Sequence, residues 1–86
     1  MAKEEYKRKY YRHFKGGIYI YLEEALHSET KEEMVIYKSL IDHKIWVRPK
    51  AMFFGNNSGG KPRFIEISFF EACQTVKKIK ERENLL

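Results

Sequence analysis

The chain has 86 residues, of which 43% are hydrophobic and 15% aromatic, and its net charge is +5. This length leaves room for one core, and this apolar content is typical of a folded domain, so the composition excludes a two-domain protein and a disordered chain. The single cysteine, Cys73, excludes an intrachain disulfide and any CxxC metal or redox motif.

The first segment of the chain is basic and lacks the apolar stretch of a secretory signal. Residues 1–15 hold six Lys or Arg against two Glu, whereas residues 16–67 hold seven groups of each sign. No apolar run approaches the roughly 20 residues of a membrane span, so we expect a cytoplasmic protein without a membrane segment. Residues 1–10 are treated as a basic leader.

Aromatic residues are interleaved with the basic residues of this first segment. Basic side chains neutralise phosphates and aromatic rings stack on bases, so this composition is typical of a surface that binds RNA or DNA. The rings also have a second interpretation. Tyr6, Tyr10 and Phe14 recur at helical spacing, which is typical of a short N-terminal helix that packs on the core. Both interpretations stay open at this point.

Two β-rich runs separated by polar residues predict a hairpin. The first run spans residues 18–27 and the second spans residues 34–40. The motif HSET, residues 27–30, brings an imidazole, two hydroxyls and a carboxylate together in sequence. Neighbours on an extended strand point to opposite faces, and no oxyanion site accompanies them. We therefore favour a turn, with His27 as a structural partner, over a catalytic group.

The next segment predicts a strand and a connector. Residues 45–48 form a short strand that ends at Pro49, because proline cannot donate to a sheet ladder. Residues 50–54 form a tight connector in which Met52 and Phe53 face the core.

A loop and a last strand precede the C-terminal helix. Residues 55–60 are rich in Gly and Asn and predict a flexible loop, because they lack the spacing of a phosphate-binding loop. Residues 62–67 predict the last strand, with Phe64 or Ile65 facing inward according to the register.

The C-terminal residues predict an amphipathic helix. Ser68 and Glu71 have the spacing of a capping box at its start. An apolar stripe follows at helical spacing and includes Cys73, where we expect a buried thiol that behaves as a small hydrophobe. The stripe consists of Phe69, Ala72, Cys73, Val76 and Ile79.

No arrangement in the sequence points to catalysis or to a metal. His13, His27 and His43 show neither HxH nor HxxxH spacing, and each lies beside a predicted turn. No paired carboxylates and no nucleophile–base pair stand out. We therefore predict a protein that is not an enzyme and that has no cofactor and no metal site.

Two arginines are candidates for binding an anion. Arg48 and Arg63 each adjoin a proline, and an arginine at a strand end can hold a phosphate or carboxylate with two hydrogen bonds. They can equally pair with a surface carboxylate such as Glu29 or Glu66. The full set of residues expected to bind a ligand is Tyr11, Arg12, Lys15, His27, Tyr37, Trp46, Arg48 and Arg63.

Motifs within residues 11–67 resemble a known family. YRHFKG, HSET, VIY, WVRP, MF and PRF follow one another in this order. The set is similar to a family of short, mostly bacterial proteins catalogued as a domain of unknown function (number 1653). The resemblance implies a small SH3-like β-barrel or roll, and it implies no activity, ligand or catalytic residue. The family usually has glycine in place of Glu23, and an acidic residue in the place of Phe54-Gly55.

These observations predict a mainly β protein. It consists of the leader of residues 1–10, a small SH3-like antiparallel barrel or roll over residues 11–67, and a C-terminal amphipathic helix over residues 68–86 that packs on it. We expect a non-catalytic binding module for RNA, DNA or another anionic partner. The alternative is a protein-interaction module that holds an extended peptide or a partner strand in a groove. The tyrosines expected to line that groove are Tyr19, Tyr21 and Tyr37.

Overall fold

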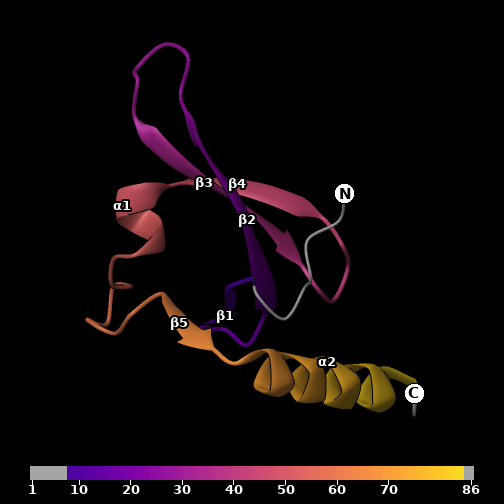
Figure 1. Ribbon diagram of the computed structural model, residues 1–86. Coiled ribbons are helices and arrows are strands. Elements are labelled where there is room, and N and C mark those ends of the chain that lie inside the picture. Colours follow the sequence, from indigo (N-terminus) through magenta and orange to yellow (C-terminus); the bar gives the residue numbers. More distant parts are fainter. Residues whose placement is uncertain (1–7, 85–86) are drawn as a thin grey trace.

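The described part of the chain folds into one antiparallel sheet with two helices (Figure 1). The computed structural model describes residues 8–84. The elements are β1 (Tyr10–His13), β2 (Ile18–Leu26), β3 (Glu33–Ser39), β4 (Ile45–Pro49), α1 (Lys50–Phe53), β5 (Phe64–Ile67) and α2 (Phe69–Asn84). The strand order is β4-β3-β2-β1-β5, so β4 and β5 are the edges, and α1 with the following loop connects them.

Each face of the sheet has its own core, because successive side chains of a strand point to opposite faces. We call the two sides the aromatic face, which α1 adjoins, and the helix face, on which α2 packs. The buried side chains of the aromatic face are Tyr11, Val35, Tyr37, Phe53 and Phe64. Those of the helix face are Tyr10, Ile18, Ile20 and Ala72. All the rings that matter below lie on the first of these faces.

The segment Tyr10–His13 is a strand, which corrects the helical interpretation of the first segment. It pairs with β2 on one side and with β5 on the other. Two ladders satisfy more backbone groups than an isolated helical turn can, so tertiary pairing overrides the helical spacing of the rings. Tyr10 is buried, and Phe14 lies exposed in the turn that follows. Tyr6 and most of the leader lie outside the described residues.

The predicted hairpin is confirmed, and the HSET motif forms its turn. The His27 N–H donates to the Glu32 carbonyl at 2.9 Å. The Nδ1 atom of His27 accepts from the N–H groups of Glu29 and Thr30, at 3.2 and 3.3 Å. His27 is therefore the structural partner that the sequence predicts. The register shifts between Tyr21 and Glu23, where a β-bulge or similar irregularity interrupts the ladder.

The connector after β4 contains one helical turn, α1, that the sequence analysis missed. Phe53 is fully buried, as expected, but the expectation for Met52 is wrong because its side chain is 46% exposed. Successive residues of a helix are rotated by about 100°, so a single turn cannot direct two neighbours into one core. The short helix thus contributes one anchor, Phe53, to the aromatic face.

The predicted loop and last strand are both present. In the loop, the Asn57 Oδ1 atom accepts from the N–H groups of Gly59 and Lys61, at 2.8 and 3.2 Å. In β5 the register turns Phe64 inward and leaves Ile65 44% exposed. This choice places Phe64 on the aromatic face opposite His13.

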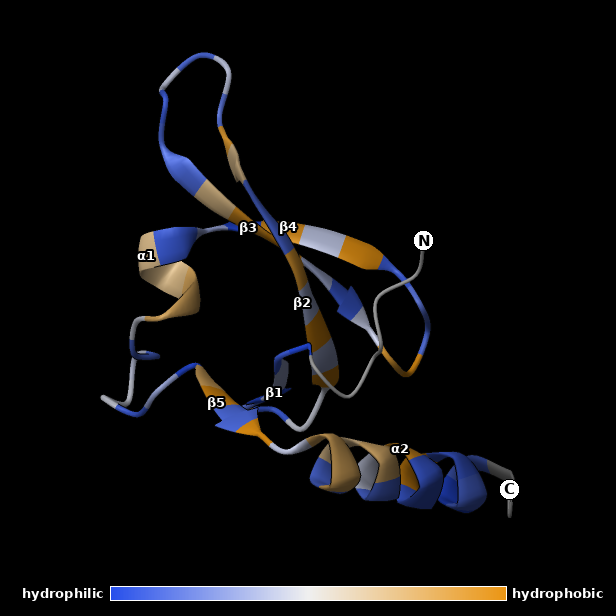
Figure 2. Ribbon diagram, viewed as in Figure 1, coloured by the Kyte–Doolittle hydropathy of each residue, from blue (hydrophilic) through white to orange (hydrophobic). Residues whose placement is uncertain are grey.

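The C-terminal helix is confirmed, and its N-terminus is capped by Ser68, whose Oγ atom accepts from the Glu71 N–H at 3.0 Å. The expectation that Cys73 is buried is wrong, because its side chain is exposed. The helix rests on the narrow β1–β2 part of the sheet through Ala72 and Val76, so the buried stripe is narrower than predicted. The later turns of α2 are mostly hydrophilic (Figure 2).

The mainly β fold with a C-terminal helix is therefore confirmed. Within residues 8–84 no ladder joins β4 to β5, so the sheet is open and the closed SH3-like barrel stays a prediction. None of the described helices is both long and apolar enough to cross a membrane.

Candidate functional site

The aromatic face carries a hollow of about 370 Å³ near the β1–β2 turn. Its lining residues are His13, Lys15, Gly17, Tyr19, Tyr37, Trp46, Arg48 and Phe64. We call it the aromatic pocket. The register explains the grouping, because His13 lies opposite Phe64 and Tyr37 lies opposite Trp46, and paired residues share a face. All five strands contribute, so only the folded chain forms this site.

The β1–β2 turn places two of the lining groups. The His13 N–H donates to the Gly17 carbonyl at 2.8 Å, and Gly16 adopts a φ of 104° that favours glycine. A Cβ atom at Gly17 would lie 2.8 Å from the ring of Tyr19. The two glycines therefore let the turn close tightly while the Tyr19 ring rests against it, with Lys15 at the adjoining position.

The pocket carries positive charge that no neighbouring carboxylate neutralises. Lys15 and Arg48 line it, and within residues 8–84 neither they nor Arg63 forms an ion pair. The Arg48 Nε atom donates to the Tyr37 hydroxyl at 3.2 Å, and its guanidinium carbon lies 5.7 Å from the centroid of the Phe64 ring. These contacts orient Arg48 without removing its charge.

His13 lies among these cations as a neutral imidazole. Burial lowers the pKa of His13, and the charges of three cations lower it further; in order of effect these are Arg48, Lys15 and Arg63. The Nδ1 atom of His13 accepts from the Lys15 N–H at 3.1 Å. The proton of the neutral ring therefore resides on Nε2, which makes this atom a hydrogen-bond donor.

Aromatic rings form the remaining walls. The centroids of Tyr19 and Tyr37 lie 5.2 Å apart in an edge-on arrangement. Burial has the largest effect on the pKa of Tyr19 and raises it. Tyr37 and Asp42 raise this pKa further, whereas the charge of Arg48 lowers it. The net effect is a raised pKa, so the Tyr19 hydroxyl stays protonated. Trp46 lies on the edge strand β4 and is 49% exposed. Its ring is accessible for stacking against a ligand.

The structure brings together four of the eight residues expected to bind a ligand. Lys15, Tyr37, Trp46 and Arg48 all line the aromatic pocket. Arg63 lies beside it, since its charge acts on His13, while one of its guanidinium nitrogens donates to the Met52 carbonyl at 2.7 Å.

The other three expected residues lie elsewhere. Tyr11 is on the same face but is buried in the core, with 6% exposure. Arg12 points to the helix face, where it pairs with Glu71 of α2 at 3.0 Å. His27 lies at the hairpin turn directly after β2, eight residues from Tyr19, which is roughly 26 Å of extended chain at 3.3 Å per residue. These three do not contribute to the pocket.

Sequence reasoning missed four lining residues, namely His13, Gly17, Tyr19 and Phe64. From the sequence, His13 is a candidate metal ligand or a residue beside a turn, and Tyr19 is part of an expected peptide groove. The alternation of Tyr11 with His13, and of Tyr19 with Tyr21, was the available signal. This signal identifies a shared face only because residues 10–13 form a strand.

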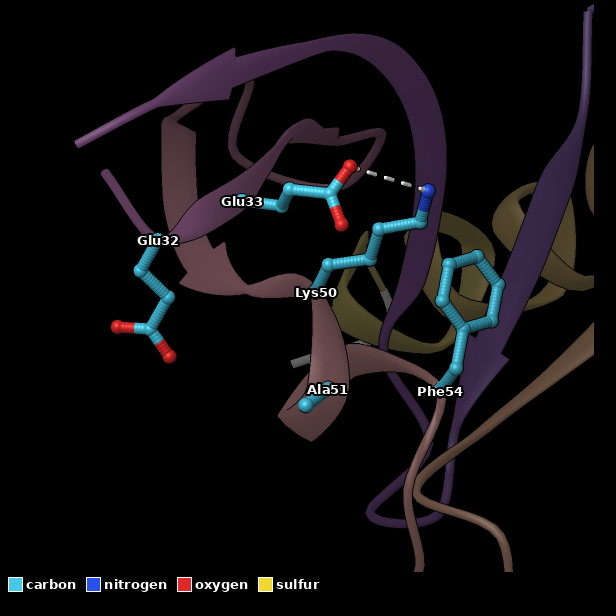
Figure 3. Close-up of a pocket in the computed structure, with 5 residues that line it drawn as sticks. All are labelled: Glu32, Glu33, Lys50, Ala51 and Phe54. Carbon is cyan, nitrogen blue, oxygen red and sulfur yellow. Dashed lines mark ion pairs between the residues drawn. The ribbon is translucent and has the colours of Figure 1, made fainter.

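A second hollow lies beside the β2–β3 hairpin and differs in charge (Figure 3). It is lined by Glu32, Glu33, Lys50, Ala51 and Phe54. Its one cation, Lys50, is already paired with Glu24 at 3.0 Å and approaches Glu33 at 4.0 Å. This hollow offers no uncompensated positive charge, so the aromatic pocket is the better candidate for an anion.

Comparison with known proteins identifies a family. The model of the family described as "Protein of unknown function (DUF1653)" matches residues 9–66. The chain belongs to this family. The matched region begins just before β1 and ends within β5, so the aromatic pocket lies wholly inside it, whereas α2 lies outside. No curated protein and no solved structure matches the chain.

Proposed function

We propose that this DUF1653 member is a cytoplasmic, non-catalytic binding module that holds single-stranded RNA or DNA through the aromatic pocket. One observation carries the proposal: the pocket combines aromatic walls with uncompensated cations, and no carboxylate is among its described lining residues. Cations neutralise phosphates, and rings stack on bases whatever their sequence. The pocket offers both types of contact within one hollow.

The expected binding is electrostatic with a stacking component. Base–aromatic stacking contributes about 1–3 kcal/mol per base, and Trp46 is the exposed ring in the best position to supply it. Arg48 is held by Tyr37 and Phe64 in one orientation, which lowers the entropy lost on meeting a phosphate. Affinity should fall as salt rises, because each neutralised phosphate releases counterions.

An NMR amide-shift titration of the full chain with short single-stranded RNA and DNA, at low and moderate salt, tests the proposal. We expect shifts around Lys15, Trp46 and Arg48 that weaken as salt rises. Trp46→Ala and Arg48→Ala should each weaken binding about tenfold, the magnitude of one stacked base or one charged contact.

Arg82→Ala is the matched control for those variants, because it removes the same charge from an exposed position on α2. It should leave the affinity unchanged. Shifts confined to residues 1–10 would instead mean that only the basic leader attracts the strand. Absence of binding at low salt would refute the proposal.

A second candidate function, binding of an extended peptide, is favoured by the exposed β4 edge. Ile45, Trp46 and Val47 are 64%, 49% and 59% exposed on this edge strand. A partner strand can add to such an edge through main-chain hydrogen bonds. The tyrosine groove expected from the sequence gives no support, because Tyr19, Tyr21 and Tyr37 all pack against the aromatic core.

The same titration separates the two functions. A peptide added to β4 should shift the amides of Ile45–Val47 without shifting that of Lys15, and it should resist moderate salt. A response centred on Lys15 and abolished by salt would count against peptide binding.

A further inference from the structure

Three positive charges surround the aromatic pocket, which is more than one internal phosphate of a strand requires. Lys15 and Arg48 line the hollow, and Arg63 lies close enough to act on His13. Asp42, whose charge acts on Tyr19, accepts the Lys44 N–H at 3.1 Å and does not line the pocket. Because electrostatic attraction scales with the product of the charges, this hollow favours a dianion over a monoanion.

Phosphate groups differ in the charge they offer such a site. A phosphate monoester carries about −1.5 to −2 at pH 7, because its second pKa is near 6. An internal phosphodiester carries a single negative charge. The terminal phosphate of a mononucleotide or of a strand end therefore matches the charge of the pocket better than an internal linkage does.

His13 adds a donor that responds to the same charge. Its Nδ1 atom is occupied by the Lys15 N–H, so the Nε2–H remains as the donor. The charged and titratable groups that act on it or face it are Lys15 from the turn, Arg48 from β4, Arg63 before β5, and Tyr19 from β2, whose ring centroid lies 6.4 Å away. A bound dianion would oppose the three cations and favour a proton on His13.

The walls and the size of the hollow restrict what the phosphate is attached to. Tyr19, Tyr37, Trp46 and Phe64 present rings to a planar partner. A volume of about 370 Å³ lies near the lower end of the range for small-ligand pockets, so the hollow accommodates one phosphorylated ring and the rest of a bound strand would lie outside it.

We propose that the aromatic pocket selects a phosphate monoester attached to a planar ring, either as a mononucleotide or as the 5′-phosphorylated end of a strand, over an internal phosphodiester. This inference rests on the proposed anion-binding function and specifies the ligand of the same pocket. Lys15, Arg48 and Arg63 supply the selecting charge, and Trp46 contacts the ring.

Isothermal titration calorimetry with the full chain tests the selection. The ligands are a short oligouridylate with and without a 5′-phosphate, uridine 5′-monophosphate, uridine, and inorganic phosphate. We expect the 5′-phosphorylated strand to bind about tenfold more tightly than its unphosphorylated form, as one added charge in a cationic hollow implies. Binding of the mononucleotide identifies a free nucleotide as sufficient, whereas binding of the phosphorylated strand alone identifies the strand end.

The outcomes distinguish this inference from the function on which it rests. Equal affinity for the two strands overturns the selection of a monoester while nucleic-acid binding stands. Failure of both strands to bind overturns nucleic-acid binding, and the selection then survives only if the mononucleotide binds and uridine does not. Inorganic phosphate that binds as tightly as the mononucleotide overturns the part of the inference that concerns the ring.

Variants assign the selection to the pocket. Lys15→Ala removes an exposed side chain, so the fold should survive, and the preference for the 5′-phosphate should drop at least threefold. Arg82→Ala, which lies on α2, should retain the full preference. A preference that is unchanged in Lys15→Ala and in Arg48→Ala would place the selection outside this pocket and overturn the inference.

Proton uptake supplies a readout that a structural role for His13 would not move. Titrations at pH 7 in two buffers of different ionisation enthalpy give the number of protons taken up on binding. We expect the wild-type protein to take up more protons than His13→Gln, because glutamine keeps a donor but cannot bind a proton. Equal uptake in the two proteins would overturn the role of His13.

Discussion

Phe53 connects the two sides of the aromatic face. Its ring stacks on that of Phe64 with centroids 4.1 Å apart, and it meets the rings of Tyr11 and Tyr37 at 5.1 and 5.2 Å. Because Phe53 comes from α1 and its partners come from β1, β3 and β5, one side chain joins segments that are distant in the sequence. It also supports Phe64 and Tyr37, which are walls of the pocket.

Truncating this ring should destabilise the protein strongly. Phe53→Ala should lower the free energy of unfolding by about 3–5 kcal/mol, through lost apolar burial and the cavity left behind. Urea denaturation followed by circular dichroism measures the change. Phe54→Ala is the matched control, because the neighbouring ring is 53% exposed, and it should cost much less. Similar losses for the two variants would contradict the assigned packing.

His13 makes the stability of the protein depend on pH in a known direction. Its pKa is lowered in the folded state by burial and then by Arg48, Lys15 and Arg63. Between this lowered pKa and the unfolded value of about 6.5, the unfolded chain binds more protons than the folded chain does. The contribution of His13 to stability is therefore present above about pH 6.5 and is lost as the pH falls toward its folded pKa.

Unfolding free energies of the wild-type protein and His13→Gln, measured by urea denaturation from pH 8 to pH 5, check this dependence. We expect stability of the wild-type protein to fall with decreasing pH by more than that of the variant. A difference between the two proteins that is constant across this range would refute the assignment.

At the scale of elements, the cap of α2 shows how local sequence signals translate into stability. The Ser68 Oγ atom accepts from the Glu71 N–H, which satisfies one of the unpaired donors at the helix start. Ser68→Ala should therefore cost about 1 kcal/mol of unfolding free energy, measured by denaturant titration. Ser58→Ala, in the exposed loop after α1, is the control and should be neutral within about 0.5 kcal/mol.

Elements with a strong local signal were predictable from the sequence, and elements that depend on distant partners were not. The hairpin of β2 and β3 and the capped helix α2 follow from alternation, turn residues and a capping serine. Strand β1 was missed because its four residues acquire their ladders from β2 and β5, which are remote in the chain. Helix α1 is a single turn, too short for a periodic signal.

The candidate site was predictable only in part, for a related reason. Trp46 and Arg48 suggested themselves by residue type and by their place at a strand end. His13 and Phe64 required the register, which pairs them across β1 and β5. The sequence alone does not distinguish Arg12 from Arg48 as a candidate for binding an anion. In the alternation of side chains along β1, however, Arg12 points to the helix face, where it pairs with Glu71 of α2. The register of the strands places basic and aromatic residues from different strands on one face, where they form one pocket.

At the scale of the whole molecule, the cations differ in whether a carboxylate pairs with them. On the helix face, Arg12 is neutralised by Glu71, and beside the hairpin Lys50 is neutralised by Glu24 and Glu33. Around the aromatic pocket the cations have no such partners within residues 8–84. The net charge of +5 therefore attracts a polyanion generally, and three cations without an ion pair among the described residues gather at the aromatic pocket.

This division predicts how binding of a single strand depends on salt. If two to three cations of the pocket neutralise phosphates, a plot of log affinity against log salt should have a slope of about −1.4 to −2.1, at roughly −0.7 per phosphate. Lys15→Ala should make the slope less steep by about 0.7, and Lys31→Ala, at the distant hairpin turn, should leave it unchanged. Fluorescence of Trp46 at several salt concentrations measures these slopes, because the ring lines the pocket. Equal effects of the two lysine variants would mean that net charge, and not the arrangement of charge around the pocket, attracts the strand.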